Sequence, residues 1–428
     1  MNSQFSLLRD RRFAPLFITQ FLGAFNDNLM KTFVVIMIAY AIWDSKPFSP
    51  EVLVSLAASI FMLPFVLFCP LAGLMTDKFD KSLILRSTKI AEIFIVILCI
   101  ITLYSQSTML ALLVLFALGT QSAFFSPGKF SILPQHLHKE ELIGANGLIS
   151  TGTYLAILAG SIYGTLIALK TFDTEIISVS MLACSIAGLI ASRFIPPAPS
   201  DKPDIPLTYN PFITAADTLR IAYTSKAGLF WAILAVSWFY FVAATIHAQF
   251  PNFVKQTLNA DTNILAIFMV VFSLGIAVGG LLNNRLLKSQ ISTRLVPYAA
   301  FAIAIFAADL FYAGGLFFAQ NHNSALLTPA EFFHTVLGWR ILADIFFLSL
   351  AGGLYIVPLR SVIQSLTPPE NCARIMAANA LTDSLFMLVS SIMATILLSI
   401  GLLVRDLFLV LALLTLCVGF ALAKYKKF

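Results

Sequence analysis

Charged residues are scarce in this sequence. Asp, Glu, Lys and Arg make up only 11% of its 428 residues, whereas soluble proteins carry about 25%. Hydrophobic residues make up 59%. Because a soluble core does not absorb such an excess, a soluble enzyme or nucleic-acid-binding protein is excluded, and no nucleic-acid partner is expected. The net charge of +6 is therefore interpreted as membrane topology.

Cysteine is scarce as well, and catalytic motifs are missing. The five cysteines are scattered through apolar runs, and no two are spaced C-x-x-C, which argues against a disulfide framework or a zinc site. No Ser-His-Asp set, pair of catalytic carboxylates or phosphate-binding loop stands outside the apolar segments. We therefore predict that the protein is not an enzyme and that it holds no metal or other cofactor.

Long apolar runs dominate the sequence. A helix of about 20 apolar residues crosses a bilayer, so this length accommodates roughly a dozen spans. We predict an all-α integral membrane protein with twelve transmembrane helices. They lie near residues 13–43, 52–75, 84–104, 108–127, 143–168, 175–195, 227–250, 263–283, 294–318, 336–359, 376–400 and 403–423.

The segment between the sixth and seventh spans divides the chain. It begins with Pro196-Pro197-Ala198-Pro199 and ends in an amphipathic stretch with Phe212 and Leu219 on one helical face. Such a helix is predicted to lie on the membrane surface. The predicted organisation is a six-helix bundle over residues 1–195, a cytoplasmic linker over 196–226 and a second six-helix bundle over 227–428.

Lysine and arginine predict the orientation. With the N-terminus in the cytoplasm, twenty basic residues fall in cytoplasmic segments and four fall outside, namely Lys46, Lys170, Lys255 and Arg405. Because basic residues favour the cytoplasmic side, we predict a multi-pass protein of a bacterial inner membrane with both termini in the cytoplasm.

The chain contains a hidden duplication. Residues 73–81 (GLMTDKFDK) follow the second span and residues 280–288 (GLLNNRLLK) follow the eighth, with the glycine, the polar fifth residue and two basic residues at identical spacing. Two further landmarks recur in matched places: Pro127-Gly-Lys129 with Pro358-Leu-Arg360, and Ala145-Asn146 with Ala378-Asn379. Three matched landmarks predict two pseudo-symmetric six-helix halves.

Two such halves joined by a cytoplasmic linker resemble the major facilitator fold. Residues 73–82 are similar to that superfamily's loop between the second and third helices, although Asp80 replaces the usual glycine and Ser82 the last base. Within the superfamily, the chain is most similar to bacterial lysophospholipid transporters and to the transporter half of acyltransferase-fused homologues. The similarity rests on four segments: QFLGAFNDN (20–28), FSPGK (125–129), ANGL (145–148) and GGLYIVPL (352–359).

This resemblance implies a secondary transporter that works by alternating access. Its substrate would be a lysophospholipid, in particular lysophosphatidylethanolamine, moved from the outer to the inner leaflet. Membrane lipids and a cytoplasmic acyltransferase would be its partners, and a monomer is expected. The chain departs from the family at Ala243-Ala244, near which enterobacterial members carry an arginine, and at Ser150, near which they carry an acid.

Ionisable residues within the spans cost about 2.5–3.5 kcal/mol each at the bilayer centre. Asp27 and Lys31 lie four residues apart in the first span, beside Asn26 and Asn28, and can pair with each other. They form either a self-neutralising pair that helps helices pack or a substrate-binding site. The resemblance implies the second, because it places the family's headgroup site at this acidic position.

The tenth span contains a second pair of charges. Arg340 and Asp344 lie four residues apart and are predicted to bind a substrate phosphate or form an outer gate. The alternative is a salt bridge within the helix.

Three other acidic residues are candidates for ion coupling. Glu92 lies three residues after Lys89 in the third span and is predicted to pair with it, while Lys89 extends towards the interface. Asp309 and Asp383 have no partner in their own helices. Burial favours the neutral form of a lone carboxyl group, so each is either a proton carrier or a hydrogen-bonding partner of a neighbouring helix.

The repeated loop also predicts a gate. Asp77 is expected to contact the positive N-terminal end of the eleventh span, which starts near Arg374, and the resemblance implies the same contact. Lys78 and Lys81 are assigned to this gate. Two other functions remain open: a proton-coupled exporter of amphipathic drugs or siderophores, and a membrane scaffold or sensor that transports nothing.

Overall fold

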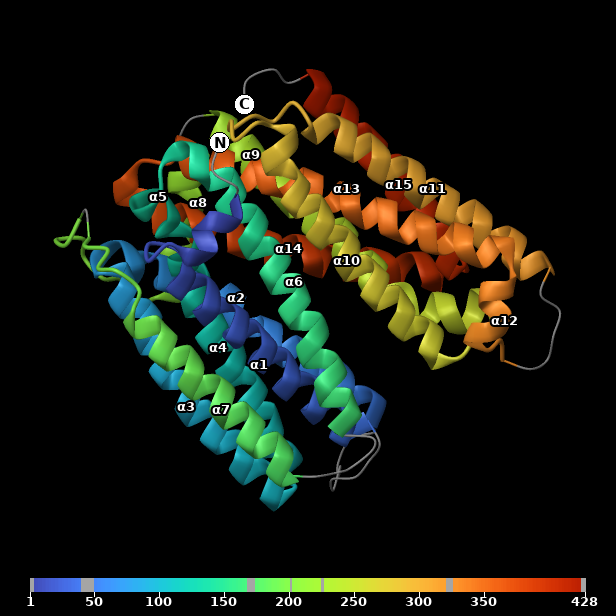
Figure 1. The fold of residues 1–428 in the computed structure, drawn as a ribbon, viewed down its shortest axis with the longest axis horizontal. Coiled ribbons are helices and arrows are strands. Elements are labelled where there is room, and N and C mark those ends of the chain that lie inside the picture. Colours follow the sequence, from blue (N-terminus) through green and yellow to red (C-terminus); the bar gives the residue numbers. More distant parts are fainter. Residues whose placement is uncertain are drawn as a thin grey trace. The chain divides into compact units, whose positions relative to one another are not determined.

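The structure, a computed structural model, describes residues 4–39, 50–167, 174–200, 202–224, 227–320 and 326–424. In this part of the chain, twelve helices of at least 20 residues each lie over one predicted span (Figure 1). The predicted twelve-helix fold is therefore confirmed. The twelve are α1 (Ala14–Ala39), α2 (Pro50–Lys78), α3 (Lys81–Ser105), α4 (Thr108–Ser131), α6 (Leu142–Leu166), α7 (Thr174–Arg193), α9 (Ala227–Asn252), α10 (Thr262–Leu286), α11 (Val296–Gln320), α13 (Val336–Leu366), α14 (Cys372–Ser399) and α15 (Val404–Lys424).

Shorter helices lie in the connections between them: α5 (Leu133–His136), α8 (Pro211–Thr224) and α12 (Pro329–His334). Side-chain caps begin several helices. Asp80 caps α3 by accepting hydrogen bonds from two backbone N–H groups, and Asp261 caps α10 by accepting one from the backbone N–H of Asn263. These caps satisfy backbone donors that have no partner within the helix.

Two of the predicted helix ends are wrong, and both involve proline. The sequence predicts that the fourth span ends near residue 127 and the tenth near residue 359, but α4 continues to Ser131 and α13 to Leu366. Proline is tolerated inside transmembrane helices because neighbouring groups satisfy the backbone carbonyl that it leaves without a partner.

Among the described residues, ten helices are long and apolar enough to cross a membrane. The other two long helices are α1, which carries Asp27 and Lys31, and α3. In α3, Lys89 and Glu92 are 0% exposed whereas Phe94 is 68% exposed. The helix therefore turns its charges inward and its apolar side chains outward, the reverse of a helix on a soluble protein.

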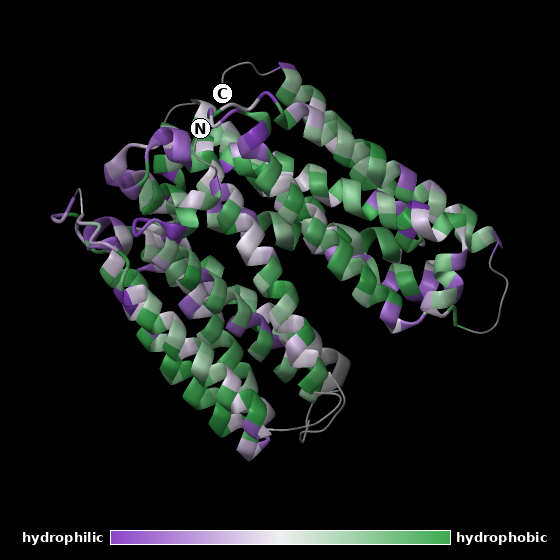
Figure 2. Ribbon diagram, in the orientation of Figure 1, coloured by the Kyte–Doolittle hydropathy of each residue, from purple (hydrophilic) through white to green (hydrophobic). Residues whose placement is uncertain are grey.

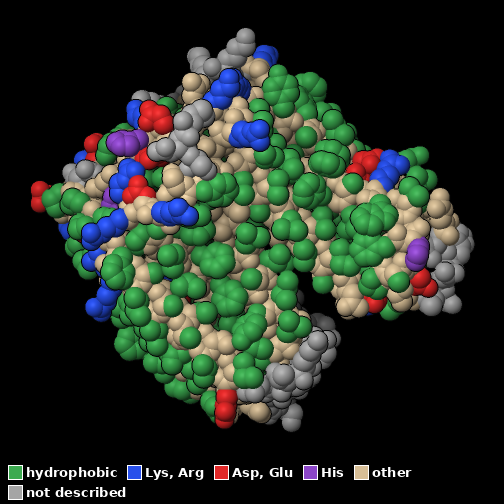
Figure 3. Space-filling model, viewed as in Figure 1, with side chains coloured by type: hydrophobic (Ala, Val, Ile, Leu, Met, Phe, Trp, Pro, Cys, Tyr) green, Lys and Arg blue, Asp and Glu red, His purple; other side chains and the backbone are tan. Residues whose placement is uncertain are grey.

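The surfaces of the helices are largely apolar. Figure 2 shows hydrophilic residues where α2 and α3 meet the linker. Figure 3 shows hydrophobic side chains over most of the visible face of each unit, with Lys and Arg side chains gathered towards one end of the first. This distribution is the one expected of a multi-pass membrane protein.

The chain forms two compact units. The first contains Met1–Ala145, Leu155–Ala227 and Gln364–Ser384, and the second contains Asn146–Tyr154, Gly228–Ile363 and Leu385–Phe428. Helices α6 and α14 each contribute residues to both units. In the first unit α1 packs against α7, and α3 packs against α4 and α7; in the second, α11 packs against α15.

The duplicated glycines lie at close helix crossings. In the first unit, a Cβ at Gly73 of α2 would lie 2.5 Å from Cβ of Ala377 in α14. In the second unit, a Cβ at Gly147 of α6 would lie 2.6 Å from the carbonyl oxygen of Gly280 in α10. Each copy of the repeated glycine therefore lies where a helix crosses the matching helix of the other predicted half, as the duplication predicts.

The linker helix α8 packs against α2. Its buried face consists of Thr214, Thr218 and Ala222, while Phe212 is 77% and Tyr223 is 68% exposed. The exposed aromatic side chains fit the predicted position at a membrane surface.

Candidate functional site

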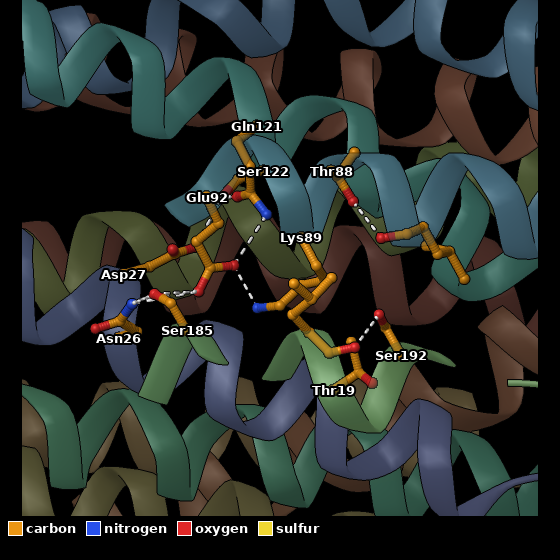
Figure 4. Close-up of polar contacts among 12 residues, drawn as sticks. Thr19, Asn26, Asp27, Thr88, Lys89, Glu92, Gln121, Ser122, Ser185 and Ser192 are labelled. Atoms are coloured by element: carbon orange, nitrogen blue, oxygen red, sulfur yellow. Dashed lines mark hydrogen bonds and ion pairs between the residues drawn. The ribbon is translucent and has the colours of Figure 1, made fainter. Parts of the chain in front are cut away.

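A cluster of polar side chains, here called the polar cluster, lies inside the first unit between α1, α3, α4 and α7 (Figure 4). Its members are Asn26, Asp27, Lys89, Glu92, Gln121, Ser122 and Ser185.

The centre of the polar cluster is an ion pair between Lys89 and Glu92. The predicted pair therefore forms. Lys89 does not extend to the interface as predicted, because it is 0% exposed. Glycines make room for it: a Cβ at Gly188 of α7 would lie 2.8 Å from its Cε, and a Cβ at Gly23 of α1 would lie 3.2 Å from its Nζ.

Glu92 joins three other helices. It accepts hydrogen bonds from Nε2 of Gln121 (3.3 Å), from Nδ2 of Asn26 (3.2 Å) and from Oγ of Ser185 (3.4 Å). A buried carboxylate is stable only when it is paired and hydrogen-bonded. The polar cluster meets both conditions and fixes α3 against its neighbours.

Asp27 lies at the edge of the polar cluster. Its Oδ2 accepts a hydrogen bond from Oγ of Ser122 (2.7 Å), and its buried Oδ1 has no partner. Lys31, predicted to pair with Asp27, instead places Nζ 5.1 Å from the ring centroid of Phe61. Asp27 therefore keeps an acceptor that no described group uses, one helical turn from a cation.

The amides on either side of Asp27, unlike its Oδ1, are hydrogen-bonded within the protein. Asn26 is 0% exposed and donates to Glu92 and Ser185, while Asn28 donates to the carbonyl oxygen of Ala24 in its own helix (2.8 Å). Successive residues of a helix point in different directions, and the substrate-binding role of these two amides stays a prediction. The amide of Asn26 joins α1 to α3 and α7.

In the second unit, the charges pair differently from the prediction. Arg340 of α13 donates from Nε to Oδ2 of Asp309 in α11 (2.9 Å) and from Nη2 to Oδ1. It therefore does not use Asp344 as its main partner. Asp309 is not a lone carboxylate, because it binds Arg340. The spacing of four residues suggested that Arg340 pairs with Asp344. The guanidinium instead binds Asp309, which belongs to the neighbouring helix α11.

Asp383 also has a partner in its own helix, contrary to the prediction. Its Oδ2 accepts a hydrogen bond from Nδ2 of Asn379, 2.6 Å away. Asn146, the matching amide of the first half, instead donates to Oγ of Ser361 in α13 (3.2 Å). The two repeated asparagines thus satisfy buried polar groups in different ways.

Asp77 makes the predicted contact. It is 2% exposed, and its carboxylate accepts hydrogen bonds from the backbone N–H groups of Ala373 (2.8 Å) and Arg374 (3.0 Å), in the first turn of α14. Nε of Arg374 adds a third bond at 3.2 Å. A carboxylate from α2 thus caps the positive end of α14. We call this contact the inner latch.

The other predicted gate residues contact the linker. Nζ of Lys78 donates to the carbonyl oxygen of Ile205 (2.6 Å), and the backbone N–H of Lys81 donates to that of Ala198 (2.9 Å). The sequence offered no signal for these contacts, since each uses a backbone carbonyl.

Asp80 also holds the linker. Its Oδ2 accepts the backbone N–H of Ala198 (3.1 Å), and its Oδ1 accepts that of Ser82 (2.7 Å). Burial raises the pKa of Asp80, but the hydrogen bonds from Ser82, Leu83 and Ala198 outweigh it and lower the pKa overall. The carboxylate therefore stays ionised near neutral pH.

Comparison with known proteins agrees with this geometry. Residues 16–342 match the family model described as Major Facilitator Superfamily. This chain belongs to that family.

Two curated relatives share one name. The lysophospholipid transporter LplT of Photorhabdus laumondii subsp. laumondii is 24% identical over 365 residues, which cover 83% of this chain and 81% of the relative. LplT of Enterobacter sp. (strain 638) is 25% identical over 350 residues, covering 81% of this chain and 78% of the relative.

Solved structures share the fold. The human organic anion transporter MFSD10 superposes with a TM-score of 0.75 at 13% identity, covering 96% of this chain and 99% of that chain. A bacterial homologue of the iron transporter ferroportin, in an outward-facing state, superposes with a TM-score of 0.67 at 13% identity, covering 95% and 99%.

Ala243 lines a small apolar pocket in the second unit, together with Phe239, Phe272, Ile303 and Leu348.

The sequence did not single out three members of the polar cluster: Gln121, Ser122 and Ser185. Their signal was present, because polar side chains within apolar spans usually hydrogen-bond across helices.

The Lys89–Glu92 pair gives a first prediction. Glu92→Gln leaves Lys89 buried without a counter-charge, and breaking a buried pair in this way costs about 3–5 kcal/mol. We expect a clear fall in the thermal unfolding midpoint of the purified protein in detergent. Adding Lys89→Met should recover much of the loss, because the glutamine introduced at position 92 keeps an acceptor for Asn26 and Ser185. A midpoint unchanged by Glu92→Gln would contradict the role of the pair.

Proposed function

We propose that this protein is a lysophospholipid transporter that moves its substrate, lysophosphatidylethanolamine in particular, from the outer to the inner leaflet of a bacterial inner membrane. The names of the two curated relatives support the substrate class. The excess of basic residues in the predicted cytoplasmic segments supports an orientation with both termini in the cytoplasm.

The observation that carries the proposal is the charge arrangement on α1. Oδ1 of Asp27 is an acceptor without a partner, and Lys31 follows one turn later with its ammonium against a phenyl ring. A buried acceptor without a donor costs about 1–3 kcal/mol, which a bound donor would recover. The ethanolamine ammonium supplies such a donor, and its phosphate suits a lysine.

Alternating access also needs a contact that forms and breaks at the inner side. The inner latch is suited to this role because it depends on one carboxylate and the first turn of one helix. Its hydrogen bonds are electrostatic contacts with the first turn of a helix. We assign to it the closing of the inner side.

The substrate is tested by uptake into liposomes that contain the purified protein. We expect saturable movement of fluorescent lysophosphatidylethanolamine to the inner leaflet, measured by protection from an external quencher. Unlabelled lysolipid should compete, and a two-chain phospholipid should not. Movement of an amphipathic drug without any movement of lysolipid would refute the proposal and favour an exporter. Liposomes with no movement of either would favour a scaffold.

A further inference from the structure

The linker between α7 and α8 begins as a proline-rich segment that lies against the first unit. Residues 195–200, together with 202 and 205, are called the strap here. Pro196, Pro197 and Pro199 restrict the backbone and remove three N–H donors. The strap therefore presents mainly carbonyl oxygens, and its partners must supply N–H or O–H groups.

Ala198 is the centre of the strap. It is 0% exposed, and both of its backbone groups are bonded to the start of α3. Its N–H donates to Oδ2 of Asp80 (3.1 Å), and its carbonyl oxygen accepts from the N–H of Lys81 (2.9 Å). Nearby, Nη2 of Arg86 donates to the carbonyl oxygen of Ile195 (2.6 Å). Because buried backbone groups need partners, these bonds make the strap a packed part of the unit.

Ser200 connects the strap to the inner latch. Its Oγ donates to the backbone carbonyl oxygen of Asp77 (2.5 Å). Asp77 lies in the last turn of α2, which ends at Lys78, and the carbonyl groups of a last turn have no partner within their own helix. The hydroxyl of Ser200 supplies that partner, so it holds the backbone of the residue whose carboxylate caps α14.

Lys202 extends to the other side of the inner latch. Its Nζ lies 3.5 Å from Oε1 of Glu370, two residues before α14 begins at Cys372. Both side chains are 45% exposed, and an ion pair between such exposed groups contributes little to stability. The strap thus makes backbone bonds on the side of α2 and α3 and a weak ion pair on the side of α14.

We propose that Ser200 and Lys202 are positioning residues of the inner gate. The strap stays bound to the ends of α2 and α3, holds Asp77 in place through Ser200, and releases α14 when the ion pair between Lys202 and Glu370 breaks. The unequal strength of the two attachments determines which of them breaks. The gating step rests on the proposed transport function, whereas the positioning of Asp77 does not.

The positioning role is tested by the reactivity of Cys372, which is 4% exposed, in a chain whose other four cysteines are replaced by alanine. In Ser200→Ala, the loss of one hydrogen bond should raise the rate of labelling by a water-soluble thiol reagent about fivefold. Ser200→Thr keeps a hydroxyl group and should restore the slow rate.

Ser399→Ala is the matched control for this experiment. Oγ of Ser399 donates within its own helix, to the carbonyl oxygen of Thr395 (2.7 Å), so the labelling rate of Cys372 should not change. A wild-type rate in Ser200→Ala overturns the positioning role, and so does a rate in Ser200→Thr as fast as that in Ser200→Ala. Neither result depends on which substrate the protein carries.

The gating step is tested by cross-linking in a chain without its five native cysteines. Lys202→Cys and Glu370→Cys are combined and joined by a bifunctional thiol reagent that a reductant cleaves. We expect lysolipid uptake into liposomes to be lost on cross-linking and to return on reduction, because the joined strap no longer releases α14.

A second pair of cysteines on the anchored side of the strap is the control. Nε2 of Gln135 in α5 donates to the carbonyl oxygen of Pro199 (3.0 Å). Cross-linking Gln135→Cys to Pro199→Cys should leave the uptake rate of that variant unchanged, because the two positions move together. Uptake that continues after Lys202→Cys is joined to Glu370→Cys overturns the gating step, as does an equal loss in the control pair. Absence of lysolipid uptake in the wild type refutes the proposed function instead, and the labelling result for Ser200 still stands.

Discussion

Replacing Asp27 with asparagine is expected to reduce uptake of lysophosphatidylethanolamine by about 10–100-fold, the equivalent of one charge-assisted hydrogen bond. The change preserves the size of the side chain and an acceptor for Ser122, which donates to Asp27 at 2.7 Å. It removes the negative charge that the proposed site presents to the ammonium group. Uptake of labelled lysolipid into liposomes, at matched protein amounts, measures the effect.

The headgroup gives this experiment its selectivity. Lysophosphatidylglycerol has no ammonium group, so its uptake should fall much less in Asp27→Asn than that of lysophosphatidylethanolamine. Asp217→Asn removes a carboxylate from the exposed face of α8 and should leave both rates unchanged. Equal losses of uptake for the two lysolipids would show that Asp27 does not recognise the ammonium group.

Asp77→Asn is expected to open the inner latch. Asparagine has one acceptor oxygen, and its NH₂ group faces a backbone N–H that Asp77 now binds, so at least one of the bonds to Ala373 and Arg374 is lost. A hydrogen bond to a charged group contributes about 1.5–3 kcal/mol, which shifts the equilibrium of the latch by roughly 10–100-fold. We expect slow transport by a protein that is still folded and inserted, with Cys372, buried at the start of α14, more reactive towards a water-soluble thiol reagent.

A second variant separates the two parts of the inner latch. Arg374→Ala removes the side-chain bond to Asp77 but keeps both backbone N–H donors. Because the backbone donors make the shorter bonds, Arg374→Ala should slow transport less than Asp77→Asn. Normal transport and unchanged Cys372 labelling in Asp77→Asn would remove the latch from the mechanism.

Much of the architecture was accessible from the sequence. Spans are predictable because a bilayer imposes one length and one composition on every helix that crosses it. The inner latch was accessible because Asp77 belongs to a repeated loop and helix ends attract carboxylates. The Lys89–Glu92 pair followed from its spacing within one turn of helix.

The sequence does not reveal which side chains of different helices pair with one another. Arg340 had two carboxylates within reach of its side chain, and only the packing of α11 on α13 decides for Asp309. Likewise, Asn26 and Asp27 are adjacent in sequence, but one amide turns into the polar cluster while the neighbouring carboxylate keeps a free acceptor. Such choices depend on helix rotation and on side chains from distant parts of the chain, which local spacing does not encode.

The inward-facing charges of α3 have a consequence for how the protein is inserted into the membrane. Taken alone, this helix would present Lys89 and Glu92 to hydrocarbon, and each such residue raises the cost of insertion by about 2.5–3.5 kcal/mol. The groups that shelter this pair belong to α1, α4 and α7, and α4 and α7 are synthesised later. The nascent chain must therefore hold α3 at the translocon until its later neighbours arrive, so that these helices enter the lipid as a group.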